Sequence, residues 1–470
     1  MIPLFPSLPP PATLAGESAR GAIVGGAFLA IFAIAETWRR RFAPPVEWTR
    51  KFVHFAGGVV AASFPWMFGT HWTVLALGGA FAGIIALGRA TGRLGSVTEV
   101  ERRSQGELYY PVGVYLLFVI ARHQPVYYLI ALSALVLSDT AAALLGRSYG
   151  RHAFPVGGDL KSLEGSAVFF LATFLGVHVP LLLGTPVDRA ASLLIAFQIA
   201  LLVTSFEAIS MRGNDNLIVP LATYYLLLKL GGAGAEHVAI QLVAQLGFLA
   251  VTLLIASRTR FLTFAGALAA HLMLYAAFSL GGPAWSLAPA LALAALLVID
   301  EFFSRDSGRP GGGHQVQAVF WVSIVAVALI FADNTLATLV PHPSLGSGHP
   351  FYAPFVGALA AQVAILAWQL LRWHRFERRL SNPTRALAAA TLGFALIAPA
   401  SLALAPGGPN AEAFAVPAAM CALALALYLG ARRLLPHRAD PRRDLRLQTL
   451  SVAAATLLVT PMHLLLIGAL

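Results

Sequence analysis

Charged residues and cysteine are both scarce in this chain of 470 residues. Only 11% of the residues are charged, whereas 58% are hydrophobic, and the mean hydropathy is +0.75. Water-soluble globular proteins of this length do not have such a composition, so a soluble enzyme is excluded. The single cysteine, Cys421, lies in an apolar run, which excludes a disulfide framework and a thiolate metal site.

Long apolar runs fill most of the sequence. Their lengths suit α-helices that cross a bilayer, and they lack the ten-residue alternation of an outer-membrane barrel. We therefore expect an all-α, polytopic integral membrane protein with about 16 transmembrane helices, the fourth and eighth of them short. The expected spans lie near 20–37, 52–69, 72–88, 108–121, 125–146, 164–184, 189–206, 216–231, 236–256, 262–280, 284–303, 316–339, 350–371, 386–405, 414–431 and 447–469.

The net charge of +11 follows topology, because most lysines and arginines fall in alternate loops. By the positive-inside rule these loops are cytoplasmic, and the expected location is the bacterial inner membrane. Orientation and contact with anionic lipid account for these basic residues, so we expect no nucleic-acid partner. Residues 1–19 are interpreted as a Pro-rich leader, which lacks the basic segment of a cleavable signal.

The stretch from Ser138 to Phe170 organises the chain. It places Asp139 inside an apolar run, about 10 Å along a helix from Gly146. A carboxylate at that depth is costly unless something pairs with it, so Asp139 is a candidate functional residue. After a loop containing Gly146 and Gly150, Lys161 and the N-cap candidate Ser162 open the next helix. Such a helix start suits phosphate oxygens.

Further polar residues occur at span ends on the same predicted side. Glu207, Asp215 and Asn216 could share a hard cation that bridges phosphates, because Mg²⁺ prefers oxygen ligands. Lys51 and His54 are three residues apart and share one helical face. Beyond residue 235 no comparable cluster occurs, so we expect the chemistry before residue 230.

Five sequence blocks then reveal a family. They are RKFVHFAGG at 50–58, ERRSQGELYYPVG at 101–113, SDTAAALLGRSYGRH at 138–152, KSLEGS at 161–166 and FEAISMRGNDNLIVPL at 206–221. In order and spacing they resemble the phytol kinase branch of the polyprenol kinases, a group that includes the dolichol kinases and is related to the phosphatidate cytidylyltransferases. The resemblance covers about residues 45–232, and its specificity comes from the combination of blocks.

The resemblance implies an integral membrane enzyme that phosphorylates a lipid alcohol with a nucleoside triphosphate, characteristically CTP. Its motifs fall on Arg50, Lys51, His54, Asp139, Ala142, Gly146, Gly150, Lys161, Ser162, Glu164, Gly165, Ser166, Glu207, Ser210, Asp215 and Asn216. We expect the catalytic residues to be Asp139, Lys161, Glu164, Asp215 and His54. We expect the nucleotide to contact Gly146, Gly150, Ser162, Gly165, Ser166, Lys51, Asn216 and Glu107. The expected Mg²⁺ ligands are Asp139, Glu207 and Asp215.

The predicted domains are the leader at 1–19, a lipid-alcohol kinase-like membrane domain at 20–232 and a second membrane domain at 233–470. Residues 262–270 and 313–317 look somewhat like the membrane family that contains phytyl-phosphate kinases. The acidic stretch of that family is absent, because the corresponding position reads AQVAILAW from residue 361. We therefore expect the second domain to be non-catalytic or a degenerate kinase-like domain.

The sequence predicts phosphorylation of a membrane isoprenoid alcohol, such as phytol or a polyprenol, by CTP or ATP at the cytoplasmic face. Lys161 would neutralise charge on the phosphoryl group, and Asp215, Asp139 or His54 would accept the hydroxyl proton. An alternative within chemistry is cytidylyl transfer to phosphatidate. A membrane transporter or lipid scramblase is the alternative of another class, but transporters carry their polar groups near the bilayer midplane.

Overall fold

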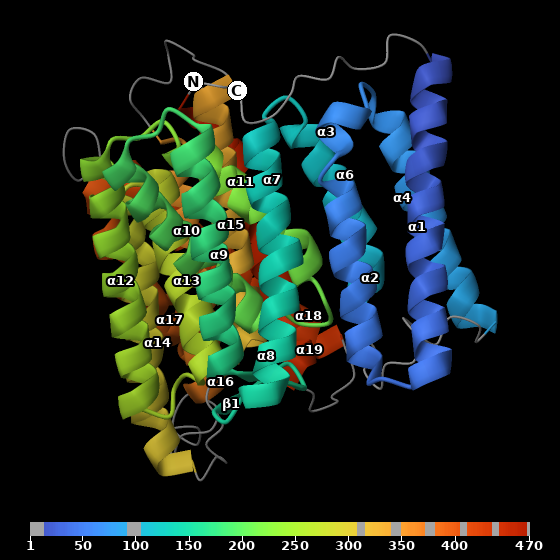
Figure 1. The fold of residues 1–470 in the computed structure, drawn as a ribbon. Coiled ribbons are helices and arrows are strands. Elements are labelled where there is room, and N and C mark those ends of the chain that lie inside the picture. The colour runs from blue at the N-terminus through green and yellow to red at the C-terminus, as the bar shows by residue number, and fades with distance from the viewer. Residues whose placement is uncertain are drawn as a thin grey trace. The chain divides into compact units, whose positions relative to one another are not determined.

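The computed structural model describes residues 14–91, 105–307, 315–339, 349–371, 381–404, 411–434 and 441–467. Nearly all of them are helical, which confirms the expected all-α membrane protein (Figure 1). Thirteen helices in these ranges are long and apolar enough to cross a membrane. The expected leader lies outside the described residues as far as residue 13, and the first helix already begins at Leu14.

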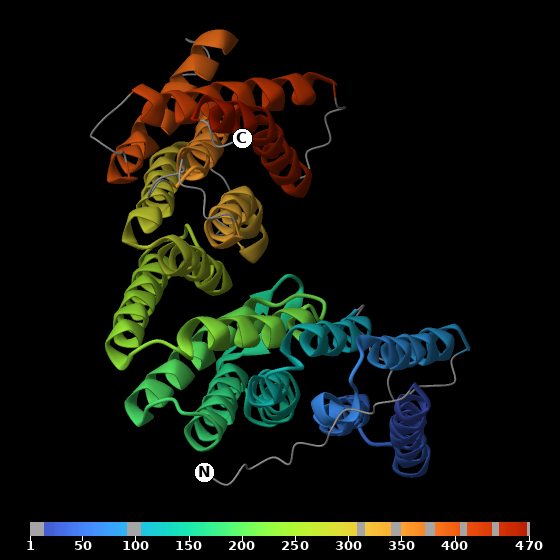
Figure 2. The same ribbon diagram turned by 90° about the horizontal axis from the view of Figure 1, so that it is seen from above.

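The chain forms two compact units, Met1–Val243 and Ala244–Leu470. Seen from above, the blue-to-green helices and the yellow-to-red helices each gather into a bundle of their own (Figure 2). The first unit consists of α1 (Leu14–Phe42), α2 (Val46–Ala61), α3 (Phe64–Met67), α4 (His71–Thr91), α6 (Gly106–Ala121), α7 (Pro125–Ser133), the π-helical turn η1 (Ala134–Ser138), α8 (Asp139–Tyr149), β1 (Ala153–Val156), β2 (Asp159–Ser162), α9 (Leu163–Gly184), α10 (Arg189–Ile209) and α11 (Asp215–Leu230). Helix α12 (Ala235–Arg258) runs across the boundary.

Three of the expected spans are shorter than the thirteen helices that are long enough to cross a membrane. The second, fourth and eighth expected spans correspond to α2, α6 and α11, which have 16 residues each. Helix α2 ends at Ala61 because Pro65 follows and a proline cannot continue an α-helical hydrogen-bond pattern. The start of α11 is fixed by the preceding turn, where Arg212 and Gly213 have positive φ angles of 57° and 84°.

The segment that the sequence predicted as a loop after α8 contains a β-hairpin. Strands β1 and β2 are antiparallel, with Ala153 opposite Ser162 and Phe154 opposite Lys161. Gly157 and Gly158 join them with φ angles of 59° and 104°, values that glycine adopts at little steric cost and that a two-residue hairpin turn requires. The hairpin therefore fixes the position of Lys161, directly before α9.

The second unit is built around α16 (Tyr352–Leu371), in which 83% of the candidate membrane-spanning window is buried inside the protein. Alanine and glycine make up much of α16, and small residues allow neighbouring helices to approach closely. Its neighbours are α14 (Pro283–Ser307), α15 (Val316–Leu339), α17 (Asn382–Ile397), the 3₁₀-helix η4 (Ala398–Leu404), α18 (Ala411–Leu434) and α19 (Pro441–Leu466). Helix α13 (Phe264–Gly281) packs against α14 and α15.

The packing of α6 against α11 provides a test of this fold. A Cβ atom added at Gly113 would collide with the backbone oxygen of Asn216, at the start of α11. Gly113→Ala should therefore separate the two helices and lower the Tm of the purified protein, by about 2–4 °C for each kcal/mol of stability lost.

Gly83→Ala is the matched control, because no described atom lies within 4 Å of the Cβ that it adds to α4. Its Tm should stay the same or rise, since alanine favours a helix over glycine by about 1 kcal/mol. Equal melting of the two variants would contradict the close approach of α6 and α11.

Candidate functional site

Asp139 is paired with Lys51 across a sequence separation of 88 residues. It begins α8, directly after the π-helical turn η1, and its Oδ2 accepts a hydrogen bond of 2.6 Å from the Lys51 Nζ of α2. His54 Nε2 lies 3.4 Å from the same oxygen. Lys51 is only 5% exposed. The cost of burying the carboxylate is therefore offset by a buried cation from a distant helix.

His54 is held from two sides. Its Nε2 lies 3.2 Å from the backbone oxygen of Leu135, within the π-helical turn, and Tyr110 donates a hydrogen bond of 3.0 Å to the His54 backbone oxygen. A backbone oxygen can only accept, so Nε2 donates in this contact and carries the hydrogen. His54 thus connects α2 to α6 and to the start of α8.

Glu47 and Arg50 complete this first cluster, and the prediction from sequence missed Glu47. The guanidinium of Arg50 makes two hydrogen bonds to the Glu47 carboxylate, of 2.5 and 3.2 Å. Opposite charges three residues apart on one helix were the available signal. The name Asp139 cluster is used below for Glu47, Arg50, Lys51, His54 and Asp139.

A second cluster surrounds Lys161. The Lys161 Nζ donates hydrogen bonds to Glu207 Oε1 at 2.6 Å, to Ser210 Oγ at 2.8 Å and to the backbone oxygen of Glu207. Glu207 and Ser210 lie at the end of α10, and the hairpin brings Lys161 to them. The name Lys161 cluster is used below for Lys161, Glu207, Ser210 and Asp215.

Asp215 enters the Lys161 cluster from the start of α11. Its Oδ2 accepts a hydrogen bond of 3.1 Å from Ser210 Oγ, and its Oδ1 accepts one of 3.0 Å from the backbone N–H of Asn216. The positive end of the helix dipole also favours an anion at this position. Within the described ranges, Asp215 has no lysine, arginine or histidine as an ion-pair partner, in contrast to Asp139 and Glu207.

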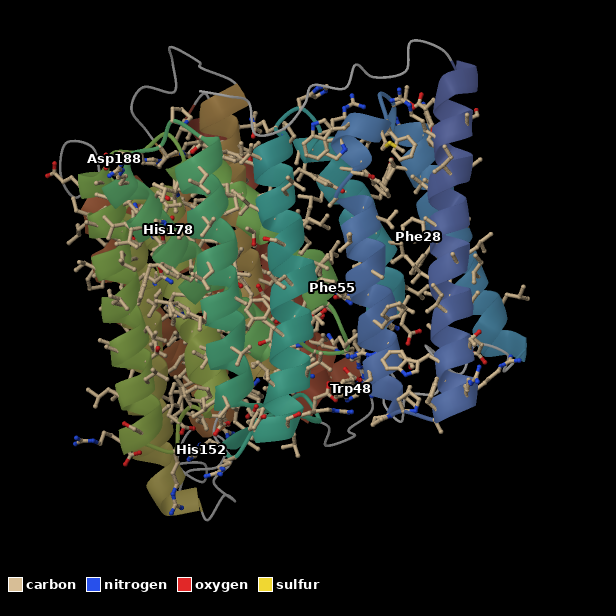
Figure 3. The ribbon with its side chains drawn as sticks, viewed as in Figure 1. Phe28, Trp48, Phe55, His152, His178 and Asp188 are labelled. Atoms are coloured by element: carbon tan, nitrogen blue, oxygen red, sulfur yellow. The ribbon has the colours of Figure 1, made fainter. Side chains whose placement is uncertain are left out.

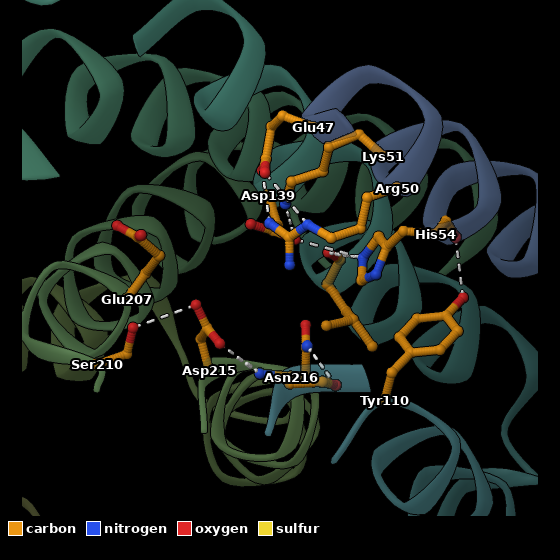
Figure 4. Close-up of polar contacts among 12 residues, drawn as sticks. Glu47, Arg50, Lys51, His54, Tyr110, Asp139, Glu207, Ser210, Asp215 and Asn216 are labelled. Atoms are coloured by element: carbon orange, nitrogen blue, oxygen red, sulfur yellow. Dashed lines mark hydrogen bonds and ion pairs between the residues drawn. The ribbon is translucent and has the colours of Figure 1, made fainter. Parts of the chain in front are cut away.

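The two clusters share one electrostatic environment. Burial by itself would lower the pKa of Lys161, but the carboxylates of Glu207, Asp215 and Asp139 together raise it. Arg50 likewise interacts electrostatically with both Asp139 and Asp215. In Figure 4 the Arg50 guanidinium and the Asp215 carboxylate point toward the same space between the clusters. The predicted catalytic and metal-binding side chains of both clusters are thus brought together.

The predicted nucleotide-binding glycines lie where α8 meets the start of α9. A Cβ atom at Gly146 would come within 3.0 Å of the Gly165 Cα, and one at Gly150 would collide with the backbone oxygen of Gly146. Ser162 is the N-cap of α9, as predicted, and its Oγ accepts the N–H of Gly165 at 3.1 Å. These contacts give the glycines a role in close packing, and their binding of a nucleotide stays a prediction.

The remaining predicted residues lie near the clusters but make other contacts. Glu164 pairs with His152 at 2.7 Å, and Ser166 is half-buried in the first turn of α9. Glu107 is buried in the first turn of α6. Asn216 donates a hydrogen bond of 2.8 Å to the Gly106 backbone oxygen and so connects α11 to α6. Their functional roles stay predictions.

The site lies toward one end of the first unit. Figure 3 shows Trp48, one turn from Lys51, and His152 toward one end of the helices, whereas His178 and Asp188 lie toward the other. No three or more His, Cys, Asp or Glu side chains in the described part of the chain are arranged to hold a metal ion by themselves. The site therefore consists of ion pairs that lie close together, and its described side chains do not form a metal site by themselves.

Comparison with known proteins identifies the family. The chain is similar to the phytol kinase of Synechocystis sp., with 35% identity over 197 residues, which are 41% of this chain and 84% of the relative. No family model and no solved structure matches the chain. The identity and the coverage of the relative confirm the resemblance seen in the sequence blocks, and the chain belongs to the phytol kinase family.

Proposed function

We propose that the first unit transfers the terminal phosphoryl group of a nucleoside triphosphate, CTP or ATP, to the hydroxyl of an isoprenoid alcohol such as phytol or a polyprenol. The main support for this proposal is that the Lys51–Asp139 and Lys161–Glu207 ion pairs and Asp215 all belong to one charged site. Membership of the phytol kinase family supports the reaction class and the kind of acceptor.

The cations of the site suit phosphate groups. Phosphoryl transfer depends mostly on positioning and on stabilising negative charge, and Arg50, Lys51 and Lys161 come from two separate elements to one place. Lys161 is anchored by Glu207 and Ser210, so its ammonium is held in position before a nucleotide arrives. Preorganised charge of this kind lowers the barrier because little rearrangement is needed during the reaction.

The acidic residues suit Mg²⁺ in their chemistry. Mg²⁺ prefers oxygen ligands and is usually bound by one or two carboxylates together with substrate phosphates, so a three-carboxylate cage is not required. Of the three predicted ligands, Asp139 and Glu207 would hold the ion together with the nucleotide phosphates, whose charge it would neutralise.

Asp215 is the best-placed acceptor for the hydroxyl proton. Asp139 and Glu207 each face a lysine ammonium, and His54 Nε2 already carries a hydrogen. Asp215 is instead held by neutral hydrogen bonds from Ser210 and a backbone N–H. A carboxylate that makes no direct ion pair can receive the proton without first losing a cation.

The site is proposed to face the cytoplasm. Arg39, Arg40 and Arg41 end α1, and Arg50 and Lys51 lie in the first turns of α2, which follows directly. An excess of basic residues marks cytoplasmic helix ends. The proposed location is a bacterial inner membrane, which the similarity to a Synechocystis protein supports. The isoprenoid chain would stay in the bilayer while its hydroxyl reaches the charged clusters.

A labelling experiment tests the reaction class. Purified protein in detergent is supplied with phytol and CTP that carries the label at either the α- or the γ-phosphate. Transfer of the γ label alone to the lipid is expected from a kinase. Transfer of the α label to phosphatidate would instead establish cytidylyl transfer, and no labelled lipid with any alcohol or nucleotide would leave a transport role as the better explanation.

Asp139→Asn should reduce phosphoryl transfer by at least about a hundredfold, because it removes a charge that positions Lys51 and the nucleotide. The control is Glu236→Gln, an exposed acid in the first turn of α12, which should keep full activity. Activity is measured with γ-labelled nucleotide.

Loss of the fold is tested separately, since Asp139→Asn leaves Lys51 buried without a carboxylate. The Lys51→Met/Asp139→Leu double variant removes both charges and should be better tolerated by the fold. It should remain in the membrane and elute as a single species, yet be inactive. An active double variant would remove the pair from the site.

Asp215→Asn tests the proton acceptor. In the variant kcat should be lower by about 10²–10⁴-fold, because an amide cannot accept the hydroxyl proton. The rate is measured with γ-labelled nucleotide, and activity close to that of the unaltered protein would assign proton acceptance to another group.

A further inference from the structure

The π-helical turn before Asp139 makes a backbone oxygen available to a side chain. In a regular α-helix the Asp139 N–H would donate to the backbone oxygen of Leu135, four residues earlier. It donates instead to the backbone oxygen of Val136, three residues earlier. The Leu135 oxygen is therefore not used by the Asp139 N–H and can accept a hydrogen bond from another helix. Single π-helical turns inside α-helices often mark functional sites.

The side chain that uses this oxygen is His54. Its Nε2 lies 3.2 Å from the Leu135 oxygen and 3.4 Å from Asp139 Oδ2 (Figure 4). A backbone oxygen only accepts, so the Nε2 hydrogen is donated to Leu135, and its partial positive charge lies beside the Asp139 carboxylate. One ring nitrogen thus stabilises both the turn and the carboxylate that follows it.

Gly58 allows α2 to come this close to the π-helical turn. A Cβ atom at Gly58 would collide with the side chain of Val136. Lys51, His54 and Gly58 are spaced by three and four residues, so they share one face of α2. The close approach at Gly58 therefore brings both Lys51 and His54 to the same carboxylate.

Tyr110 holds His54 in place from α6. Its hydroxyl donates a hydrogen bond of 3.0 Å to the His54 backbone oxygen, and the centroids of the two rings are 4.3 Å apart. Tyr110 is 6% exposed, and the His54 side chain is 11% exposed. The imidazole has little freedom to rotate in these surroundings, so its Nε2 stays directed at the Leu135 oxygen.

We propose that His54 is a positioning residue. Through its Nε2 hydrogen it fixes the start of α8 and holds the Asp139 carboxylate against Lys51, and it does not take the proton from the alcohol. This inference rests on the proposed function, in which Asp139 is one of the groups that hold the nucleotide and its cation. The site then requires a hydrogen-bond donor at the position of Nε2, and an amide N–H would serve as well as an imidazole N–H.

Two variants of His54 separate positioning from proton transfer. The amide nitrogen of glutamine is as many bonds from Cβ as Nε2 is, so His54→Gln keeps a donor for the Leu135 oxygen but cannot take up a proton. His54→Leu removes the donor. With γ-labelled nucleotide, His54→Leu should lower the rate by about 10–100-fold, the usual effect of removing a group that orients a ligating carboxylate. His54→Gln should recover most of that loss.

His237→Leu is the matched control, because His237 is exposed in the first turn of α12. It should keep full activity, and all variants should elute from the membrane extract as a single species. Equal loss of activity in His54→Gln and His54→Leu would overturn the proposal and make His54 a group that transfers a proton. Full activity of His54→Leu would overturn it too, because no positioning would then be needed.

A second measurement does not depend on activity. The histidine rings of the full-length protein are labelled with ¹⁵N, and the NMR signals of His54 are identified as those that disappear in His54→Gln. The proposal predicts a hydrogen on Nε2 that exchanges slowly with water, because it is donated to the Leu135 oxygen. An Nε2 without a hydrogen would overturn the positioning role and leave the proposed kinase function standing. Absence of phosphoryl transfer in the unaltered protein would instead overturn the proposed function, and the role of His54 in it, whatever the NMR result.

Discussion

The cost of burying charge in an apolar helical bundle controls the architecture of the first unit. A carboxylate there needs a cation or several hydrogen bonds, and two cations come from elements far away in the sequence: Lys51 for Asp139 and Lys161 for Glu207. Each pair therefore fastens two elements to one another. The contacts that hold α2, α8, β2 and α10 together are the same contacts that gather the charged side chains.

The sequence identifies which charges are buried better than it identifies their partners. Asp139 could be recognised because a lone acid in an apolar run has few explanations, and the N-cap Ser162 because its chemistry is local. The pairing of Asp139 with Lys51 depends on how α2 packs, which no local pattern encodes. The π-helical turn before Asp139 was likewise unpredicted, because it is a small departure from an α-helical pattern.

The β-hairpin was missed for a different reason. Gly157 and Gly158 are a recognisable turn signal, but the two strands have only four residues each and lie between long helices. Composition and hydropathy favour helices everywhere else, so a short hairpin is easily interpreted as a loop. Its effect is large all the same, because the pairing of Phe154 with Lys161 fixes where the second lysine enters the site.

The two units differ in the polar side chains that they bury in pairs: lysines with carboxylates in the first unit, and glutamines in the second. The first unit buries the lysine–carboxylate pairs Lys51–Asp139 and Lys161–Glu207. In the proposed function the lysines would meet the nucleotide phosphates, and the carboxylates would hold the cation. The second unit buries the neutral amides of Gln362 and Gln448, which cost less in a low-dielectric interior than charges and do not neutralise a phosphate. The charged pairs are therefore the reason for placing the proposed phosphoryl transfer in the first unit.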